Sequence, residues 1–522
     1  MFNTFLKSKN YCIIYLILII LLGASTITHL NFKHPEFIIL VFVIVAILGI
    51  FCILFYFNND KQLHKVAFVI IICFGIVTAF IVPICDISDE IEHLTRAEIT
   101  SQGVIIPHWT GEDMGVDSLY NHTENERFSS VRNDGAGYNS IASMMFFMKN
   151  LSNTFFDTAH DTDKINYTPQ IIDSAFEQNP FYGYLPQAIG ILIAKLLDLN
   201  VIWILWLARI CNLICYAAIV SYAIKKAPVL KMPLLAVACI PISIYQAAST
   251  SIDSMIFALG ILAVSYFIYM YKGEDNSLDI KDVAIFSVIC LLLGLCKLPY
   301  LAFIFLLFFV PANNFKFNDK NRYIIILVSI AIVGLIGVLW SRHSVPALAH
   351  SWRSSHNLIN STLQIQHFLN HPSAIPKFIF ALFTTRLYHI ILGLFNFFGA
   401  SKASHYIDKY YIVVASLTCY LAVTLLAYPK NIKFDLKTKI GAALIILVIY
   451  LGTCFIQLLT FADVGTTSLG LSTRYFIPLF ALLPIAVWIK LPFDKNKFDK
   501  YAFVLMIAFM ATLVLSFLTK YY

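Results

Sequence analysis

Charged side chains are scarce in this sequence. Only 13% of its 522 residues are charged, whereas 59% are hydrophobic and the mean hydropathy is +0.76. A soluble chain would carry about 25% charged and about 45–50% apolar residues. This shortage excludes a soluble globular enzyme, a disordered chain and a secreted disulfide scaffold. It predicts a membrane protein in which apolar runs of about 20 residues cross the bilayer as helices.

Disulfide and metal motifs are missing as well. The chain has 11 cysteines but no Cys-x-x-Cys pair and no Cys/His metal spacing. Since they lie in or at the end of apolar runs, we interpret them as small residues packed between helices. Segment 341–371 holds five histidines without the His-Glu-x-x-His spacing, and His367 and His371 are the pair best placed for a metal. The sequence therefore predicts no certain cofactor and leaves a divalent cation open.

Basic residues lie mostly in short connections, and acidic residues gather in one long segment. Segment 86–180 has 16 acidic and five basic residues. Short loops rich in Lys and Arg stay in the cytoplasm. We therefore expect a cytoplasmic N-terminus and an extracytoplasmic acidic segment. The predicted fold is an all-α polytopic transmembrane helix bundle with about 13 crossings and a long extracytoplasmic loop after the third helix.

This topology divides the chain into three parts. Residues 1–85 would form three N-terminal transmembrane helices, and residues 86–200 a large acidic extracytoplasmic loop with juxtamembrane helices. Residues 201–522 would form the C-terminal transmembrane helices, with an outer segment at 341–408.

Three apolar runs cannot each form a single crossing if the basic loops are all to lie on one side of the membrane. We expect 183–197 and 378–399 to lie on the outer face without crossing. The run 283–311 is interrupted at Lys297 and is predicted to be a hairpin of two short helices, with Lys297 near the outer interface. A single long tilted helix is the alternative.

A concentrated polar cluster opens the acidic segment. On a helix that starts at Ser88, the side chains of Asp89, His93 and Arg96 share one face. A carboxylate, an imidazole and a guanidinium placed together suit general-base work on an acceptor hydroxyl. The alternative is a capped interfacial helix, in which Ser88 is the N-cap and Asp89 and Glu90 complement the helix dipole.

Four cations lie within or at the edges of apolar runs, namely Arg209, Lys297, Arg386 and Arg474. Charges inside a membrane usually face a cavity or a partner. Should they converge on the outer side, they would form an anion site for a phosphate. The alternative is that they extend toward lipid headgroups. Asp253 is most simply interpreted as a helix start.

Seven short motifs follow one another between about residues 70 and 490. They are Pro83…Asp89-Glu90-x-x-His93-x-x-Arg96-Ala97…Gly103, Asn179-Pro180…Tyr184-Leu185-Pro186-Gln187-Ala188, Arg209-x-x-Asn212, Pro241…Ala248-Ser249…Asp253, Lys297-Leu298-Pro299-Tyr300, Gly393…Phe398-Gly399 and Arg474-Tyr475-Phe476-Ile477-Pro478. In this order they resemble family 2142 of domains of unknown function, an uncharacterised bacterial membrane family. The sequence departs from the family at Ile91, where proline is common, and at Ser472-Thr473, where Gln-Gly is common.

That family is similar to the type C glycosyltransferases, which use polyprenyl-phosphate sugar donors. The resemblance implies a bacterial cell-membrane protein in which Asp89 is the general base and Glu90 is a second acid or an orienting group. Lys297, Arg386 or Arg474 would bind the donor phosphate. The full set predicted to bind substrate or lipid phosphate is His93, Arg96, Arg209, Lys297, Tyr300, Arg386, Arg474 and Tyr475.

The predicted function is transfer of a sugar from a polyprenyl-phosphate donor to a cell-envelope glycan, teichoic acid or protein, with no nucleic-acid partner. One alternative is a carrier or flippase for lipid-linked sugars or glycans. Another is a glycan polymerase or ligase that depends on loop arginines and histidines. The acidic cluster outside the membrane and the lack of paired broken helices favour the enzyme. The enzyme hypothesis requires Asp89 to face Lys297 and Arg474.

Overall fold

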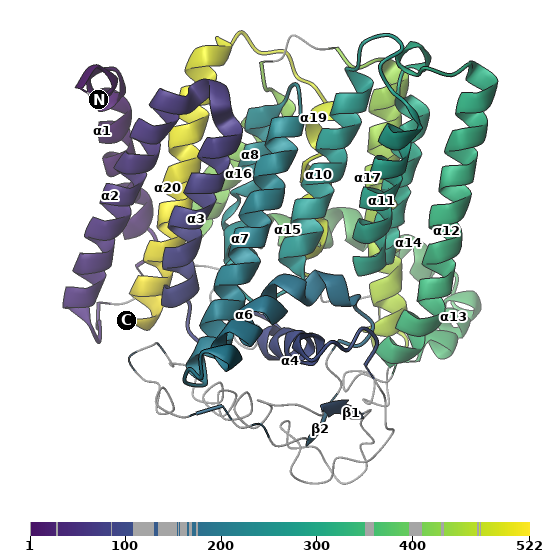
Figure 1. Cartoon of the computed structure of the whole chain (residues 1–522), viewed down its shortest axis with the longest axis horizontal. Helices are drawn as coiled ribbons and strands as arrows, with labels where there is room; N and C mark the ends of the chain where they lie inside the picture. The colour runs from purple at the N-terminus through teal and green to yellow at the C-terminus, as the bar shows by residue number, and fades with distance from the viewer. Residues whose placement is uncertain are drawn as a thin grey trace.

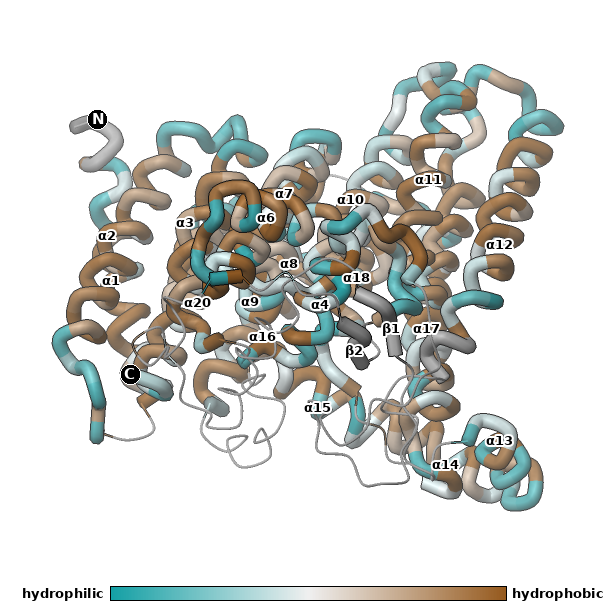
Figure 2. The backbone as a smooth tube through the Cα atoms, turned by 60° about the horizontal axis from the view of Figure 1, so that its bottom comes forward, coloured by the Kyte–Doolittle hydropathy of each residue, from teal (hydrophilic) through white to brown (hydrophobic). Residues whose placement is uncertain are grey.

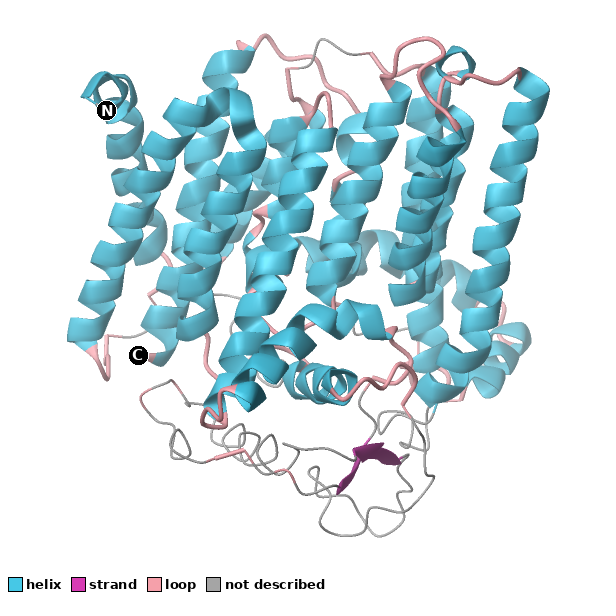
Figure 3. Ribbon diagram, in the orientation of Figure 1, coloured by secondary structure: helices cyan, strands magenta, loops and turns pink. Residues whose placement is uncertain are grey.

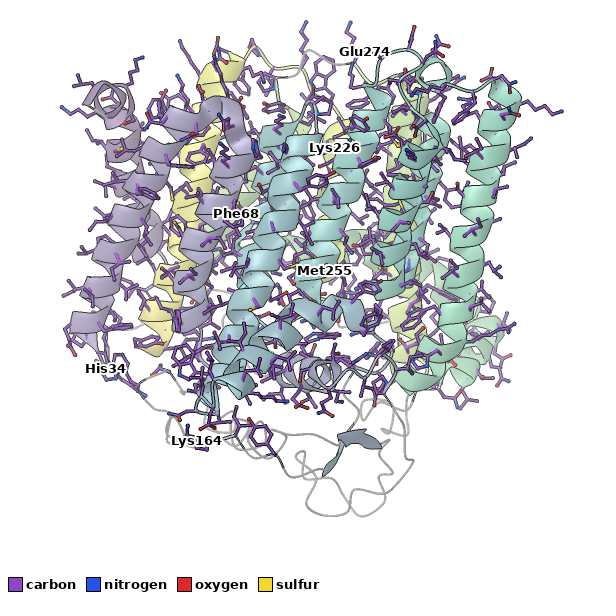
Figure 4. The ribbon with its side chains drawn as sticks, in the orientation of Figure 1. His34, Phe68, Lys164, Lys226, Met255 and Glu274 are labelled. Atoms are coloured by element: carbon purple, nitrogen blue, oxygen red, sulfur yellow. The ribbon has the colours of Figure 1, made fainter. Side chains whose placement is uncertain are left out.

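The long helices of this protein run side by side along one common direction (Figure 1). The computed structural model describes residues 2–27, 30–84, 86–107, 176–349, 360–395, 410–429, 433–466, 469 and 471–522, with short pieces between 130 and 173. Figure 4 places Lys226 and Glu274 toward one end of the bundle, and His34 and Lys164 toward the other. We name these the Lys226 end and the Lys164 end.

Eight helical stretches of the described residues are long and apolar enough to cross a membrane. Besides segment 374–392, they comprise α1 (Phe2–Ala24), α2 (Pro35–Asn59) with α3 (Leu63–Ile81), α7 (Ile202–Lys226), α10 (Asp253–Tyr271), α12 (Asp319–Ala349), α17 (Leu436–Thr460) and α20 (Lys495–Tyr521). Figure 3 shows how far helix dominates the described chain. The all-α polytopic bundle is confirmed, whereas the count of 13 crossings and the cytoplasmic side stay predictions.

Apolar residues make up most of the long helices, and polar residues mark most of the connections (Figure 2). Helices that are apolar all round are suited to a membrane or to a buried core. Only 17% of the apolar window of α12 is buried inside the protein, against 94% of that of α20. Therefore α12 presents most of its side chains outward, whereas α20 is enclosed by other helices and packs against α1, α2 and α3.

The run 283–311 forms two helical segments that pack against each other. Helix α11 (Ile280–Cys296) ends at Lys297, whose backbone is extended, and a 3₁₀ helix (Leu298–Phe309) follows with Pro299 in its first turn. The predicted hairpin is confirmed. Because a 3₁₀ helix rises about 2.0 Å per residue, its 12 residues span about 24 Å, where an α-helix would span about 18 Å.

Several other apolar runs are broken into short helices. Helix α6 (Leu185–Leu196) is about 18 Å long at 1.5 Å per residue, too short for a core of about 30 Å, as expected for a stretch that does not cross. The apolar run near 232–250 contains α8 (Lys231–Ala238) and α9 (Pro241–Ala247). The run near 475–490 contains α18 (Ile477–Phe480) and α19 (Leu483–Ala486), preceded by a 3₁₀ turn (Thr473–Phe476).

Segment 374–392 was expected to stay outside the membrane. It comprises α14 (Ala374–Ala381), a π turn (Leu382–Arg386) and α15 (Leu387–Leu392), and it follows α13 (Ser361–Asn370) and precedes α16 (Tyr411–Leu426). By length and composition it qualifies as a membrane span. Figure 1 shows α14 and α15 at similar heights behind the other helices, so the segment lies across the bundle. Its position relative to the bilayer stays a prediction.

Little of the predicted acidic loop falls within the described residues. They include α4 (Glu90–Ser101) and an antiparallel pair of strands, β1 (Ser130–Asn133) and β2 (Gln170–Asp173), beyond the Lys164 end of the helices (Figure 1). Most of segment 108–175 and the outer residues 350–359 and 396–409 lie outside the description. The division into three parts therefore stays a prediction.

Candidate functional site

Asp89 lies just before α4 in a backbone conformation that is unusual for its residue type. Its φ of 62° and ψ of 21° are left-handed, and its side chain makes no capping bond to the helix. For an L-residue this region costs roughly 1–2 kcal/mol. The alternative of a helix capped by Ser88 is wrong, because α4 begins at Glu90 and the Asp89 carboxylate turns away toward Arg474.

Arg474 joins two carboxylates that are distant in the sequence. Its Nη2 lies 2.5 Å from Asp89 Oδ2, and its Nε lies 3.3 Å from Asp253 Oδ2. Its Nη1 donates to the carbonyl oxygen of Ser88. The side chains are 6% (arginine), 11% (Asp89) and 9% (Asp253) exposed, so this ionic cluster is nearly buried. Asp253 begins α10, as predicted for a helix start, and its carboxylate also faces Arg474.

Lys297 lies against the ring of Tyr475, the residue that follows Arg474 in the sequence. Its Nζ is 3.3 Å from the centroid of the Tyr475 ring, and the Arg474 guanidinium carbon is 5.4 Å from the same centroid. Tyr300 donates its hydroxyl hydrogen to the Tyr475 carbonyl at 2.7 Å. Within the described residues, Lys297 Nζ contacts this aromatic face and no hydrogen-bond acceptor.

Glu90 and Arg209 form a separate, fully buried pair. The guanidinium contacts both carboxylate oxygens, at 2.8 Å (Nε to Oε1) and 2.6 Å (Nη2 to Oε2). Arg209 also donates to the carbonyl oxygens of Ala79, Val82 and Pro83. Bidentate arginine–carboxylate pairs fix the relative orientation of the two side chains as well as neutralising their charges. The pair therefore ties α7 to the end of α3 and the start of α4, on both sides of Asp89.

The turn before α10 is held by the same network. Thr250 donates its backbone N–H to Glu90 Oε1 at 3.3 Å and its hydroxyl to the Glu90 carbonyl at 2.9 Å. Asn212 and Gln187 donate to carbonyl oxygens of the turn at Ser249 and Thr250. These bonds place Asp253 next to Arg474. The roles of Thr250 and Asp253 were missed, although an acid after three small polar residues at a helix start was a visible signal.

His93 and Arg96 do not join Asp89, contrary to the expected shared face. His93 Nδ1 lies 2.8 Å from the Tyr184 hydroxyl, and the Arg96 guanidinium carbon lies 5.7 Å from the centre of the Tyr184 ring. Arg96 also donates to Thr100 and to the carbonyl of Ile105. The reason is the helix start: Asp89 precedes the first turn, so its side chain is out of register with the two helical residues.

Arg386 lies at the end of the π turn between α14 and α15. The Tyr450 hydroxyl of α17 donates to the Leu382 carbonyl of this turn at 2.6 Å. Pro299, two residues after Lys297, lies next to Gly452 of the same helix. Arg386 and Lys297 therefore lie near the same part of α17. On this side, the Thr473 hydroxyl donates to the Ile390 carbonyl and so links α15 to the turn that carries Arg474.

Asp86 lies three residues before Asp89, near the C-terminal end of α20. Its Oδ1 accepts a hydrogen bond from the Tyr521 hydroxyl at 2.6 Å, and its carbonyl accepts one from Tyr245. Burial raises the pKa of the Asp86 carboxyl, against the opposing effect of the Lys520 charge.

The expected histidine pair forms a ring stack, with 4.6 Å between the centroids of His367 and His371. Among the described residues, no group of three or more His, Cys, Asp or Glu side chains could hold a metal ion. His350 and His356 lie outside the described residues.

A comparison with known families matches residues 72–483 to a family described as "Predicted membrane protein (DUF2142)". All of the ionic and hydrogen-bonding residues around Asp89, Glu90 and Arg474 fall within that range. No curated protein and no solved structure matches the chain.

Proposed function

Because the chain belongs to this family, whose description gives a membrane protein and no activity, we propose a function from the site: transfer of a sugar from a polyprenyl phosphate to a hydroxyl of a cell-envelope acceptor. One observation carries the proposal. The Asp89 carboxylate is turned out of the helix-capping position and held by Arg474, and Tyr475 links this arginine to Lys297.

In this proposal Asp89 is the general base. The acceptor hydroxyl oxygen attacks the anomeric carbon of the sugar, and its proton passes to Asp89. The bond from the anomeric carbon to the phosphate oxygen breaks, and polyprenyl phosphate leaves. Arg474 holds the Asp89 carboxylate in place. Asp253 also contacts Arg474, so the charge of the arginine is balanced before the substrate binds. Positioned bases of this kind contribute about 10²–10⁴-fold to a rate.

Lys297 is the proposed ligand of the donor phosphate. Its ammonium has three N–H donors and contacts an aromatic face rather than an oxygen acceptor among the described residues. A phosphate can take those donors without breaking an existing ion pair. Negative charge grows on the phosphate as the sugar leaves, so a fixed cation would stabilise the transition state more than the ground state.

Glu90 and Arg209 have a different part in this proposal. Each is fully buried and paired with the other, and Arg209 is also bonded to three carbonyl oxygens. We therefore assign Glu90 the orienting role rather than that of a second acid. The same saturation argues against a carrier in which Arg209 lines a substrate path.

The test is sugar transfer in membranes that contain the full chain, with radiolabelled polyprenyl-phosphate sugars as donors. Asp89→Asn is expected to lower the rate about 10²–10⁴-fold. The matched control is Asp198→Asn, whose carboxylate pairs with Lys164 while 78% exposed, and it should keep the wild-type rate. Lys297→Gln should lower kcat as well as raise the KM for the donor, because the lost cation stabilises the transition state more than the bound donor.

Equal transfer by wild type and by an equally abundant Asp89→Asn protein would rule out Asp89 as the base. If the wild type transfers no sugar with any acceptor fraction but moves labelled donor lipid between leaflets, the carrier replaces the enzyme.

A further inference from the structure

A basic cavity lies at the Lys226 end of the bundle, away from the Asp89 site. It has a volume of about 250 Å³ and opens between the α2–α3 connection, the α7–α8 connection and the start of α20. Lys61, Lys231 and Lys495 line it, together with Asp60 and Asp499. The lysines outnumber the carboxylates, so the cavity attracts an anion.

An apolar groove of about 380 Å³ runs between α1, α16 and α20. Its lining includes Leu18, Cys419 and Val423, and on α20 it extends from Phe498 to Phe509. The eleven helical rises from Phe498 to Phe509 measure about 16 Å, which is about half of a hydrocarbon core of about 30 Å. The groove therefore has the depth of one lipid leaflet.

The cavity and the groove share a wall. Tyr428 lines the cavity, and its ring lies 5.7 Å from the ring of Phe498, which lines the groove. On α20, the cavity is lined by Lys495 and Asp499. The groove is lined by Phe498 and Ala502 of the same helix. The two spaces share no lining residue, so one molecule would occupy both with its anionic head in the cavity and its apolar chain passing over the Tyr428–Phe498 contact into the groove.

We propose that this composite site binds one anionic phospholipid from the leaflet at the Lys226 end. Its phosphate lies among the three lysines and one acyl chain lies in the groove. Basic pockets between membrane helices bind anionic headgroups in this way. Asp499 Oδ1 is buried and has no hydrogen-bond partner among the described residues, and a headgroup hydroxyl, as in phosphatidylglycerol, would donate to it. This site is independent of sugar transfer.

The test is native mass spectrometry of the purified full chain, titrated with phosphatidylglycerol against a background of phosphatidylcholine. One phosphatidylglycerol should be retained per chain. At about fivefold per lysine, the triple variant Lys61→Gln/Lys231→Gln/Lys495→Gln should bind it about 100-fold more weakly. The control is Lys316→Gln/Lys320→Gln/Lys437→Gln, which removes the same charge from exposed lysines of other connections and should bind normally.

A second variant tests the acyl chain. Cys419 is exposed and lines the groove, so Cys419→Trp fills it from the outside and should weaken binding at least tenfold. An equal loss in the two lysine variants would mean general attraction to the surface and would overturn the proposal. So would displacement of the lipid by inorganic phosphate together with normal binding to Cys419→Trp, since the site would then hold an anion without a lipid.

Discussion

At the scale of single residues, two substitutions of Asp89 distinguish the effect of its backbone conformation on stability from the effect of its carboxylate on sugar transfer. Asp89→Gly and Asp89→Ala both remove the carboxylate, but only glycine adopts a φ of 62° without strain. We expect the glycine variant to be more stable than the alanine variant by about 1 kcal/mol, and both to lose sugar transfer equally. Denaturant unfolding of the two purified proteins measures the difference. Equal stabilities would contradict the left-handed turn.

A second residue-scale prediction concerns Asp86 and pH. Since burial raises the pKa of its carboxyl, the folded protein binds this proton more tightly than the unfolded chain does. The resulting stability is present below the unfolded pKa of about 4 and is lost as pH rises through the folded value. Asp86→Asn keeps an acceptor for Tyr521 and carries no charge. Its advantage in unfolding temperature over wild type should therefore grow from pH 5 to pH 8, and a shrinking advantage would contradict the assignment.

At the scale of elements, the end of α15 meets the turn that carries Arg474 at Gly393. A Cβ there would lie 2.0 Å from Thr473 Oγ1, so Gly393→Ala must displace this turn. We expect a loss of about 1–3 kcal/mol of stability and reduced transfer, with partial recovery in Gly393→Ala/Thr473→Ala. Gly334→Ala in α12 is the control, because its Cβ would meet nothing within 4 Å. Thermal unfolding and transfer assays of wild type, Gly393→Ala, Gly393→Ala/Thr473→Ala and Gly334→Ala test this prediction.

The elements also show where sequence reasoning succeeds and where it stops. The hairpin at Lys297 followed from the parity of crossings and the Lys-Leu-Pro interruption, which are local signals. The pairing of Glu90 with Arg209 joins residues 119 positions apart, and it depends on packing that no local pattern encodes. The start of α4 was predicted wrongly because no sequence pattern indicates a left-handed aspartate. This error led to the wrong prediction that His93 and Arg96 share a helix face with Asp89.

At the scale of the whole molecule, the distribution of charge predicts which end faces the cytoplasm. Lys164 and Glu274 lie toward opposite ends, and both are exposed (Figure 4). In intact cells a membrane-impermeant maleimide should label Lys164→Cys and leave Glu274→Cys unlabelled until the cells are opened. The wild-type chain controls for its own cysteines. Labelling of Glu274→Cys alone would reverse the topology.

The burial of α20 against the first three helices has a consequence for how the protein is made. Helices α1, α2 and α3 pack against α20, which is synthesised long after them. At 5–20 residues per second, translation from Ile81 to Lys495 takes roughly 20–80 s. During that time the first three helices are in the membrane without the partner that fills their common face. The packing of the first three helices is therefore completed only when the last helix has been made. A chain that stops before residue 495 leaves their shared face uncovered, which is a feature that quality-control proteases recognise.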